Sequence, residues 1–167
     1  MVEVPEAERV LGVRLPADYV AFLEIFGAGY IGDVDSCVSQ PCGNWGVVAM
    51  TAQFRKLAPE HFMPMPAGWR ADSLIQFDFE PDGFHHYWLV TGEDSDHWPV
   101  VQFEEGVNGD AWTVLEGGFV DVLLRRWAPV AGSRDREPVP FMHWRKHDRL
   151  AVHGHFDSRT GLPFLFE

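Results

Sequence analysis

The residues of this chain with the clearest capacity for chemistry are its eight histidines, several of which lie near the C-terminal end. His143 and His147 are four residues apart, a spacing that places two imidazoles on one helix face, as in many zinc sites. His153, His155 and Asp157 alternate, so on a strand they point the same way and could complete a metal site. A tryptophan replaces the glutamate of the H-E-x-x-H motif. We therefore favour a solvated tail without a metal, and keep a metal-dependent enzyme as the minor alternative.

A glycine motif near the N-terminus suggests a second kind of chemistry. Gly27, Gly29 and Gly32 spell G-x-G-x-x-G, the fingerprint of dinucleotide-binding proteins. That motif binds a pyrophosphate only where a strand enters the turn and a helix leaves it. Here a helix is expected to enter, a short loop-like stretch follows, and no acidic residue stands about twenty positions further on. The glycines are therefore interpreted as a helix end and a tight turn, and no cofactor is expected.

The remaining reactive side chains form no recognised catalytic set. Cys37 and Cys42 have half of a zinc-ligand spacing, but the chain has no second thiol pair, so both are interpreted as free loop thiols. The paired carboxylates, Asp78 with Glu80 and Glu104 with Glu105, are attributed mostly to turns and solvated faces. His85 and His86 flank the start of a predicted strand without a partner in the sequence, and the pair is interpreted as incidental. Nucleophile-elbow and P-loop motifs are absent from the sequence. We therefore expect a protein that is not an enzyme.

Apolar periodicity predicts an α+β domain over residues 1–127. Helices are expected over residues 5–11, 16–26, 52–57 and 119–127. Strand signals, joined mostly by turn residues typical of a β-meander, cover residues 45–50, 74–79, 86–91, 99–103 and 112–115. Residues 128–140 have the composition of a linker, and residues 141–167 are predicted to pack on the same domain as a hairpin with strands at 150–156 and 162–166. The expected architecture is an antiparallel-rich mixed sheet flanked by the N-terminal helices and the closing helix.

Residues 8–32 (ERVLGVRLPADYVAFLEIFGAGYIG) carry the most specific pattern of the chain. Pro16 suits the first position of a helix, and an apolar stripe follows at Tyr19, Phe22, Leu23 and Phe26. This stretch resembles the N-terminal signature of the SUKH superfamily, "E..LG..LP.DY..FL...G.G", and the looser resemblance extends over about residues 3–127. The family consists mainly of bacterial immunity proteins that neutralise toxins, and also includes fungal regulators of cell-wall synthesis. The resemblance therefore implies a protein-binding module.

Charge is distributed unevenly along the chain. The formal net charge is −12, and residues 1–122 carry 5 Lys and Arg against 20 Asp and Glu, whereas residues 123–167 carry 8 against 5. An acidic body repels phosphate backbones, so DNA and RNA are not expected as direct ligands. A basic protein partner is expected instead, because opposite fields accelerate encounter.

The cellular location is predicted from three features of the sequence. The acidic N-terminus lacks a secretory signal, no apolar run reaches membrane-spanning length, and the chain has only two cysteines. These features predict a cytoplasmic protein.

The resemblance and the acidic charge together predict an immunity protein that binds a cognate bacterial toxin, for which a nuclease is one candidate, and blocks it stoichiometrically. The alternative is a regulatory or scaffold module that binds a host protein without neutralising a toxin. The predicted partner-binding residues are acids of turns and strand ends with two aromatic anchors: Asp82, Glu93, Asp94, Asp96, Glu104, Glu105, Tyr87 and Trp98. Trp88 was weighed as a third anchor, and core packing is favoured for it. Reversal of Glu93, Asp94 and Asp96 to lysine is expected to slow association and leave the fold intact.

Overall fold

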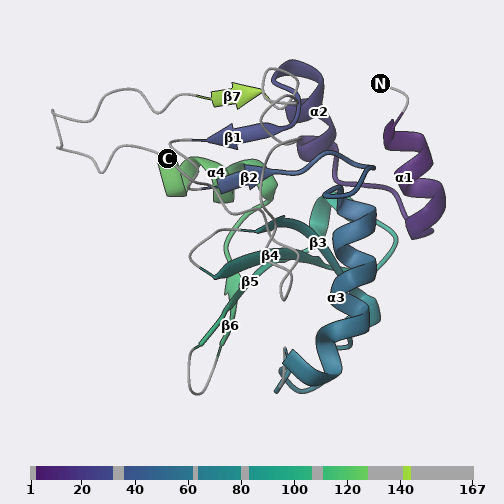
Figure 1. Cartoon of the computed structure of the whole chain (residues 1–167), viewed down its shortest axis with the longest axis vertical. Coiled ribbons are helices and arrows are strands. Elements are labelled where there is room, and N and C mark those ends of the chain that lie inside the picture. The colour runs from purple at the N-terminus through teal and green to yellow at the C-terminus, as the bar shows by residue number, and fades with distance from the viewer. Residues whose placement is uncertain are drawn as a thin grey trace, which may run out of the picture.

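The computed structural model confirms an α+β architecture (Figure 1). It describes residues 3–31, 36–61, 64–79, 83–106, 111–127 and 141–143. The predicted linker over 128–140 and the hairpin strands at 150–156 and 162–166 lie outside these residues. In the described part, no helix is both long and apolar enough to cross a membrane.

The described residues form four α-helices: α1 (Glu3–Leu11), α2 (Ala17–Ile25), α3 (Val47–His61) and α4 (Phe119–Trp127). Helix α2 starts one residue after the expected position, because Pro16 is the N-cap residue. Gly27 ends it with a φ of 77°, a conformation that favours glycine, and its N–H donates to the carbonyl of Leu23 at 2.9 Å. Strand β1 (Gly29–Ile31) follows directly. A helix therefore enters the glycine motif and a strand begins within it at Gly29, whereas a dinucleotide site needs a strand before the motif and a helix after it.

The predicted meander is confirmed as a four-stranded antiparallel sheet in the order β3-β4-β5-β6. Its strands are β3 (Leu74–Phe79), β4 (Phe84–Leu89), β5 (Val100–Glu104) and β6 (Trp112–Leu115). A second antiparallel sheet has the order β2-β1-β7, with β2 at Ser36–Val38 and β7 at Phe141–His143. All pairings between the described strands are antiparallel, in agreement with the predicted antiparallel-rich sheet.

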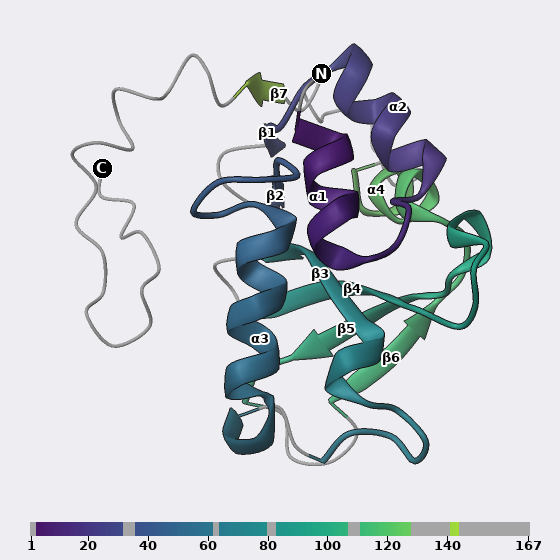
Figure 2. The same ribbon diagram turned by 90° about the vertical axis from the view of Figure 1, so that its right-hand side faces the viewer.

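The two faces of the four-stranded sheet carry separate apolar clusters. One face packs mainly on α1, α2 and α4, with the rings of Tyr19, Trp88 and Phe119 in contact at its centre. The other face packs on α3 through Phe54 and Ala58, and Figure 2 shows α3 alongside the sheet. Alternate residues of each strand point to opposite faces, so both sets of side chains can be buried. The sheet is therefore the middle layer of the domain.

The stretch before β3 differs from its prediction. The structure places one helix, α3, over Val47–His61, where the sequence analysis expected a strand at 45–50 and a short helix at 52–57. The paired valines at its start favour a strand locally. Packing overrides that preference, because Val47, Met50, Phe54 and Ala58 recur at helical spacing and are all buried. The prediction of a loop-like stretch over 33–38 is also wrong in part, since β2 lies there.

Candidate functional site

The predicted acidic residues form two groups at opposite ends of β5. Glu93, Asp94 and Asp96 surround η2 (Ser95–His97), a short 3-10 helix that precedes the strand. Glu104 ends the strand and Glu105 follows it. A five-residue strand separates its ends by roughly 13 Å, so the two groups are not one patch. Asp82 lies outside the described residues.

The group at η2 also has a structural task. Asp94 accepts a hydrogen bond from the Asp96 N–H at 3.3 Å and lies 2.8 Å from the His97 ring nitrogen Nδ1. Asp96 Oδ1 accepts one from the Ala17 N–H at 2.6 Å, although the two residues are 79 positions apart. Pro16 supplies no side-chain cap to α2, so Asp96 takes that place from a distant loop. Reversal of Asp96 is therefore expected to remove a helix cap as well as a surface charge, so the prediction that the fold stays intact now includes a cost in stability.

Replacing Asp96 by alanine is expected to lower the free energy of unfolding by about 1 kcal/mol, the usual cost of losing a helix cap. Glu93 is the matched control, because it is an exposed acid of the same loop with no hydrogen bond described for its side chain. Its replacement by alanine is expected to leave stability unchanged. Urea unfolding of both variants measures the difference. Equal stabilities would contradict the capping role of Asp96.

The aromatic residues proposed as anchors lie inside the domain. Tyr87 is fully buried against α3, and Trp98 is 4 % exposed, with its indole N–H donating to the carbonyl of Gly92 at 2.9 Å. Neither ring is available at the surface, so their assignment as partner anchors is corrected to a role in packing. Trp88 is 1 % exposed, which confirms the favoured interpretation that it packs in the core.

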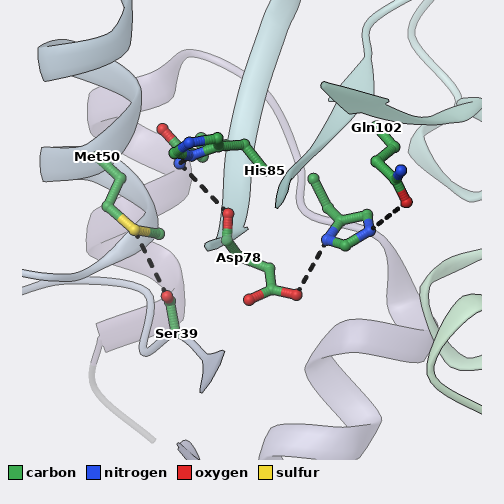
Figure 3. A network of polar contacts seen from close by, with 7 residues as sticks. Ser39, Met50, Asp78, His85 and Gln102 are labelled. Carbon is green, nitrogen blue, oxygen red and sulfur yellow. Dashed lines mark hydrogen bonds and ion pairs between the residues drawn. The ribbon is translucent and has the colours of Figure 1, made fainter. Parts of the chain in front are cut away.

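The histidine pair that sequence analysis dismissed belongs to buried polar contacts on β4 (Figure 3). His86 Nδ1 lies 3.1 Å from Asp78 Oδ2, and its Nε2 lies 3.2 Å from the Gln102 side-chain oxygen. The register of β3 against β4 shifts between Gln76 and Asp78, and directly after this irregularity Asp78 pairs with His86. Asp78, His86 and Gln102 are direct partners across three neighbouring strands. The sequence could not predict this row, because it depends on how the strands pair.

His85 points to the other face of the sheet and joins a second chain of contacts. Its Nδ1 lies 3.2 Å from the Gln76 amide nitrogen, and its Nε2 lies 2.9 Å from Glu105 Oε1. A neutral ring satisfies both contacts, with Nδ1 accepting from the amide and Nε2–H donating to the carboxylate. Glu105, a predicted partner residue, therefore supports this buried histidine as well. Both chains tie β3 to its neighbours, which stabilises the register of the sheet.

In the described part of the chain, no three His, Cys, Asp or Glu side chains converge as metal ligands. His143 is described only as the last residue of β7, and the other four residues of the predicted metal set lie outside the described ranges. The side chain of Cys37 is likewise not described, while Cys42 is a free, partly buried thiol whose pKa is raised chiefly by its burial. The metal hypothesis therefore stays a prediction.

Comparison with known proteins agrees with the arrangement of helices and strands. A family model described as SUKH_6, SMI1-KNR4 cell-wall, matches residues 2–116, more than half of the chain. The chain belongs to the SUKH superfamily. No curated protein and no solved structure matches this SUKH chain.

The signature residues of this SUKH domain make contacts between its elements. Glu8 Oε1 accepts from the Leu15 N–H at 3.0 Å and thereby fixes the turn between α1 and α2. Asp18 Oδ2 accepts from the Val120 N–H at 3.1 Å at the start of α4. The Tyr19 hydroxyl donates to the carbonyl of Ser39 at 2.6 Å in the buried core. The signature is therefore a set of structural contacts, which explains why it resembles no catalytic motif.

Tyr19 and Tyr87 provide a matched test of buried hydroxyl groups in the SUKH core. Replacing Tyr19 by phenylalanine removes a buried hydrogen bond and is expected to lower the free energy of unfolding by about 1–2 kcal/mol. The Tyr87 hydroxyl is buried and has no hydrogen-bond partner among the described residues, so its replacement by phenylalanine is expected to leave stability unchanged or raise it. Urea unfolding measures both. A larger loss for the Tyr87 variant would contradict this assignment.

Tyr87 also predicts a pH dependence. Burial, with the Glu105 carboxylate as a second cause, raises the pKa of the Tyr87 phenol well above its usual value. In the unfolded chain a phenol loses its proton near pH 10, while the folded domain retains it. The unfolded state therefore binds fewer protons above about pH 10, and stability falls as the pH rises. The Tyr87→Phe variant is expected to show a shallower fall between pH 9 and 11.

Proposed function

We propose that this SUKH domain is an immunity protein that binds a cognate bacterial toxin in the cytoplasm and blocks it by stoichiometric contact, without catalysis. The observation that carries the proposal is the family match over residues 2–116, because the superfamily consists mainly of such proteins. The contacts of the signature residues are consistent with binding, since they build a scaffold and leave the surface to define the partner.

The charge of the chain supports a basic partner. Net charge is −12, and exposed acids occur at both ends of β5, with Glu93, Asp94 and Asp96 at one end and Glu105 at the other. Opposite charges accelerate association and suppress wrong pairings. Nuclease toxins fit this chemistry, because their clefts bind phosphates and acidic side chains can occupy the same positions. The toxin is therefore proposed to be a basic domain, with nucleases as the favoured class.

The test begins with capture of the tagged protein from its native cells at low salt, followed by release with increasing salt. A basic polypeptide that is toxic when produced alone, and harmless with an equimolar amount of the SUKH protein, is the expected result. A captured host protein without toxicity would instead favour the regulatory alternative, which the cell-wall description of the family model also suggests. Recovery of no protein at any salt concentration would contradict the proposal.

Association kinetics with the captured toxin test the electrostatic part. Glu93→Lys and Glu104→Lys change the net charge equally but lie at opposite ends of β5. At low salt, a charge reversal that lies near the bound toxin is expected to lower the association rate several-fold. Added salt is expected to reduce this difference from the unmodified protein. The larger effect identifies the end that faces the toxin. Unchanged association rates for both variants would contradict steering by these acids.

A further inference from the structure

Helix α2 is apolar around most of its circumference, which is unusual for a helix at the surface. Tyr19 and Leu23 point into the core, as expected. On the outer side, however, Ala21 is exposed beside the charged Glu24, Ile25 is 73 % exposed, and Phe26, which follows the helix, is 50 % exposed. A surface helix normally carries polar residues on its outer side. Figure 2 shows α2 at the periphery of the domain, with α4 beside it.

The exposed large apolar side chains of the described residues include two neighbours at the end of α2 and one on the adjacent helix α4. Ile25 and Phe26 belong to α2 and its end, and Leu124, 62 % exposed, belongs to α4. The two helices pack together through the Phe22 and Phe119 rings, whose centres are 5.6 Å apart. Clusters of exposed apolar side chains commonly mark interaction surfaces, whereas isolated ones are ordinary.

Acidic residues border this surface at the other end of α2. The Asp96 hydrogen bond to the Ala17 N–H joins the η2 loop to the first residue of the helix. Glu93 and Asp94, both exposed, lie in the same loop. Helix α2 has nine residues, so Ala17, which the acidic loop contacts, lies roughly 12 Å along the helix axis from Ile25. An apolar centre with a charged border has the composition of a protein-binding surface.

We propose that the outer side of α2, formed by Ala21, Ile25 and Phe26 and bordered by Glu93 and Asp94, is the docking surface for the protein partner. Its occupant is a polypeptide segment whose apolar side chains are flanked by lysine or arginine, because that chemistry complements both parts of the surface. The acidity of the chain disfavours a second copy, since the borders would repel one another. The inference rests on the proposed function only for the identity of the partner.

A synthetic amphipathic peptide of lysine and leucine is the probe, and a lysine–serine peptide of equal charge is its control. The full-length, 15N-labelled protein is titrated with each peptide at low salt. The lysine–leucine peptide is expected to shift the amide signals of residues 17–27 and 93–97, and the control peptide is expected to bind more weakly. Saturable shifts confined to other elements, or no binding of the lysine–leucine peptide, would overturn the proposal.

Matched variants separate the docking surface from exposed apolar residues in general. The double variant Ile25→Ser and Phe26→Ser is expected to weaken peptide binding about tenfold or more. Val114→Ser is the control, because Val114 is 58 % exposed but lies on β6. Thermal unfolding checks that all variants stay folded. Equal binding by the double variant and the control would overturn the proposal. The proposal would also be overturned if the amide signals of residues 17–27 shifted with protein concentration in the absence of peptide, because that result would assign the surface to a second copy of the chain.

The same variants distinguish this inference from the proposed function. If the double variant neutralises the captured toxin as well as the unmodified protein, the docking surface is wrong and the immunity function stands. If no toxin is captured but the peptide binds at α2, the immunity function fails and the docking surface stands. Loss of peptide binding together with loss of neutralisation supports both.

Discussion

Replacing Gly46 by alanine is expected to destabilise the domain by about 3 kcal/mol or more, because the added methyl group has no space. Gly46 precedes α3 and its carbonyl accepts the Met50 N–H at 2.9 Å. A Cβ at this position would overlap the carbonyl carbon and oxygen of Cys42 and lie 2.8 Å from its Cα. These are backbone atoms, so no side-chain rotation relieves the overlap. Either the turn between Cys42 and α3 shifts or the helix moves off the sheet.

Gly92 is the matched control for this substitution. A Cβ built on Gly92 meets no atom within 4 Å, so Gly92→Ala is expected to leave stability unchanged. Urea unfolding followed by circular dichroism measures both variants. If Gly46→Ala does not fold, its soluble yield beside that of Gly92→Ala reports the same difference. A Gly46→Ala variant as stable as the unmodified protein would show that the turn adapts freely.

Replacing Trp88 by alanine is expected to lower the free energy of unfolding by about 3–5 kcal/mol. The indole is 1 % exposed, and its ring centre lies 5.0 Å from that of Tyr19 and 4.4 Å from that of Phe77. Its removal therefore leaves a cavity at the junction of the sheet with α2 and α4. The cost exceeds the loss of buried surface, because the neighbouring rings relax only partly into the space.

Trp88→Phe is the companion variant, since it retains one aromatic ring at the same position. The Trp88 indole N–H is buried and has no hydrogen-bond partner in the part of the chain that the structure describes, so phenylalanine loses volume but no hydrogen bond seen there. Its cost is expected to be less than half of that of the alanine variant. Urea unfolding of the two proteins measures the difference. Similar losses for both would indicate that packing at this site depends on the complete indole.

The elements with strong periodicity and clear turn residues were predictable from the sequence. The meander from β3 to β6 and the closing helix α4 follow from alternating apolar residues and an apolar stripe. The sequence predicts a strand and a short helix in place of α3, because the first residues of α3 favour a strand when taken alone, while its buried stripe extends over 47–58. The short strand β2 offers too few residues for any pattern, and only its pairing with β1 defines it.

The candidate site was only partly predictable, because exposure depends on tertiary contacts. Glu93 and Asp94 are exposed, as expected for turn acids, but Tyr87 is buried since α3 covers that face of the sheet. Neighbouring residues of β4 point to opposite faces, yet both faces of this sheet are covered, so alternation did not identify an exposed side. The apolar stripe of α2 predicts a buried side, which the structure confirms at Tyr19 and Leu23. It did not predict that Phe26, a member of the stripe, is half exposed, because that depends on what packs beyond the helix end.

The two distant helix caps have a consequence for how the chain folds. Asp96 caps α2 across 79 positions, and Asp18 contacts the first turn of α4 across 102 positions. Contacts between residues so far apart in sequence form late, since a long loop must close before they can contribute. During synthesis, α2 therefore lacks its cap until Asp96 has been added, and it lacks its contact with α4 until Val120 has been added. Nascent chains that end before residue 96 are expected to be more sensitive to proteolysis at α2 than those that extend beyond residue 127.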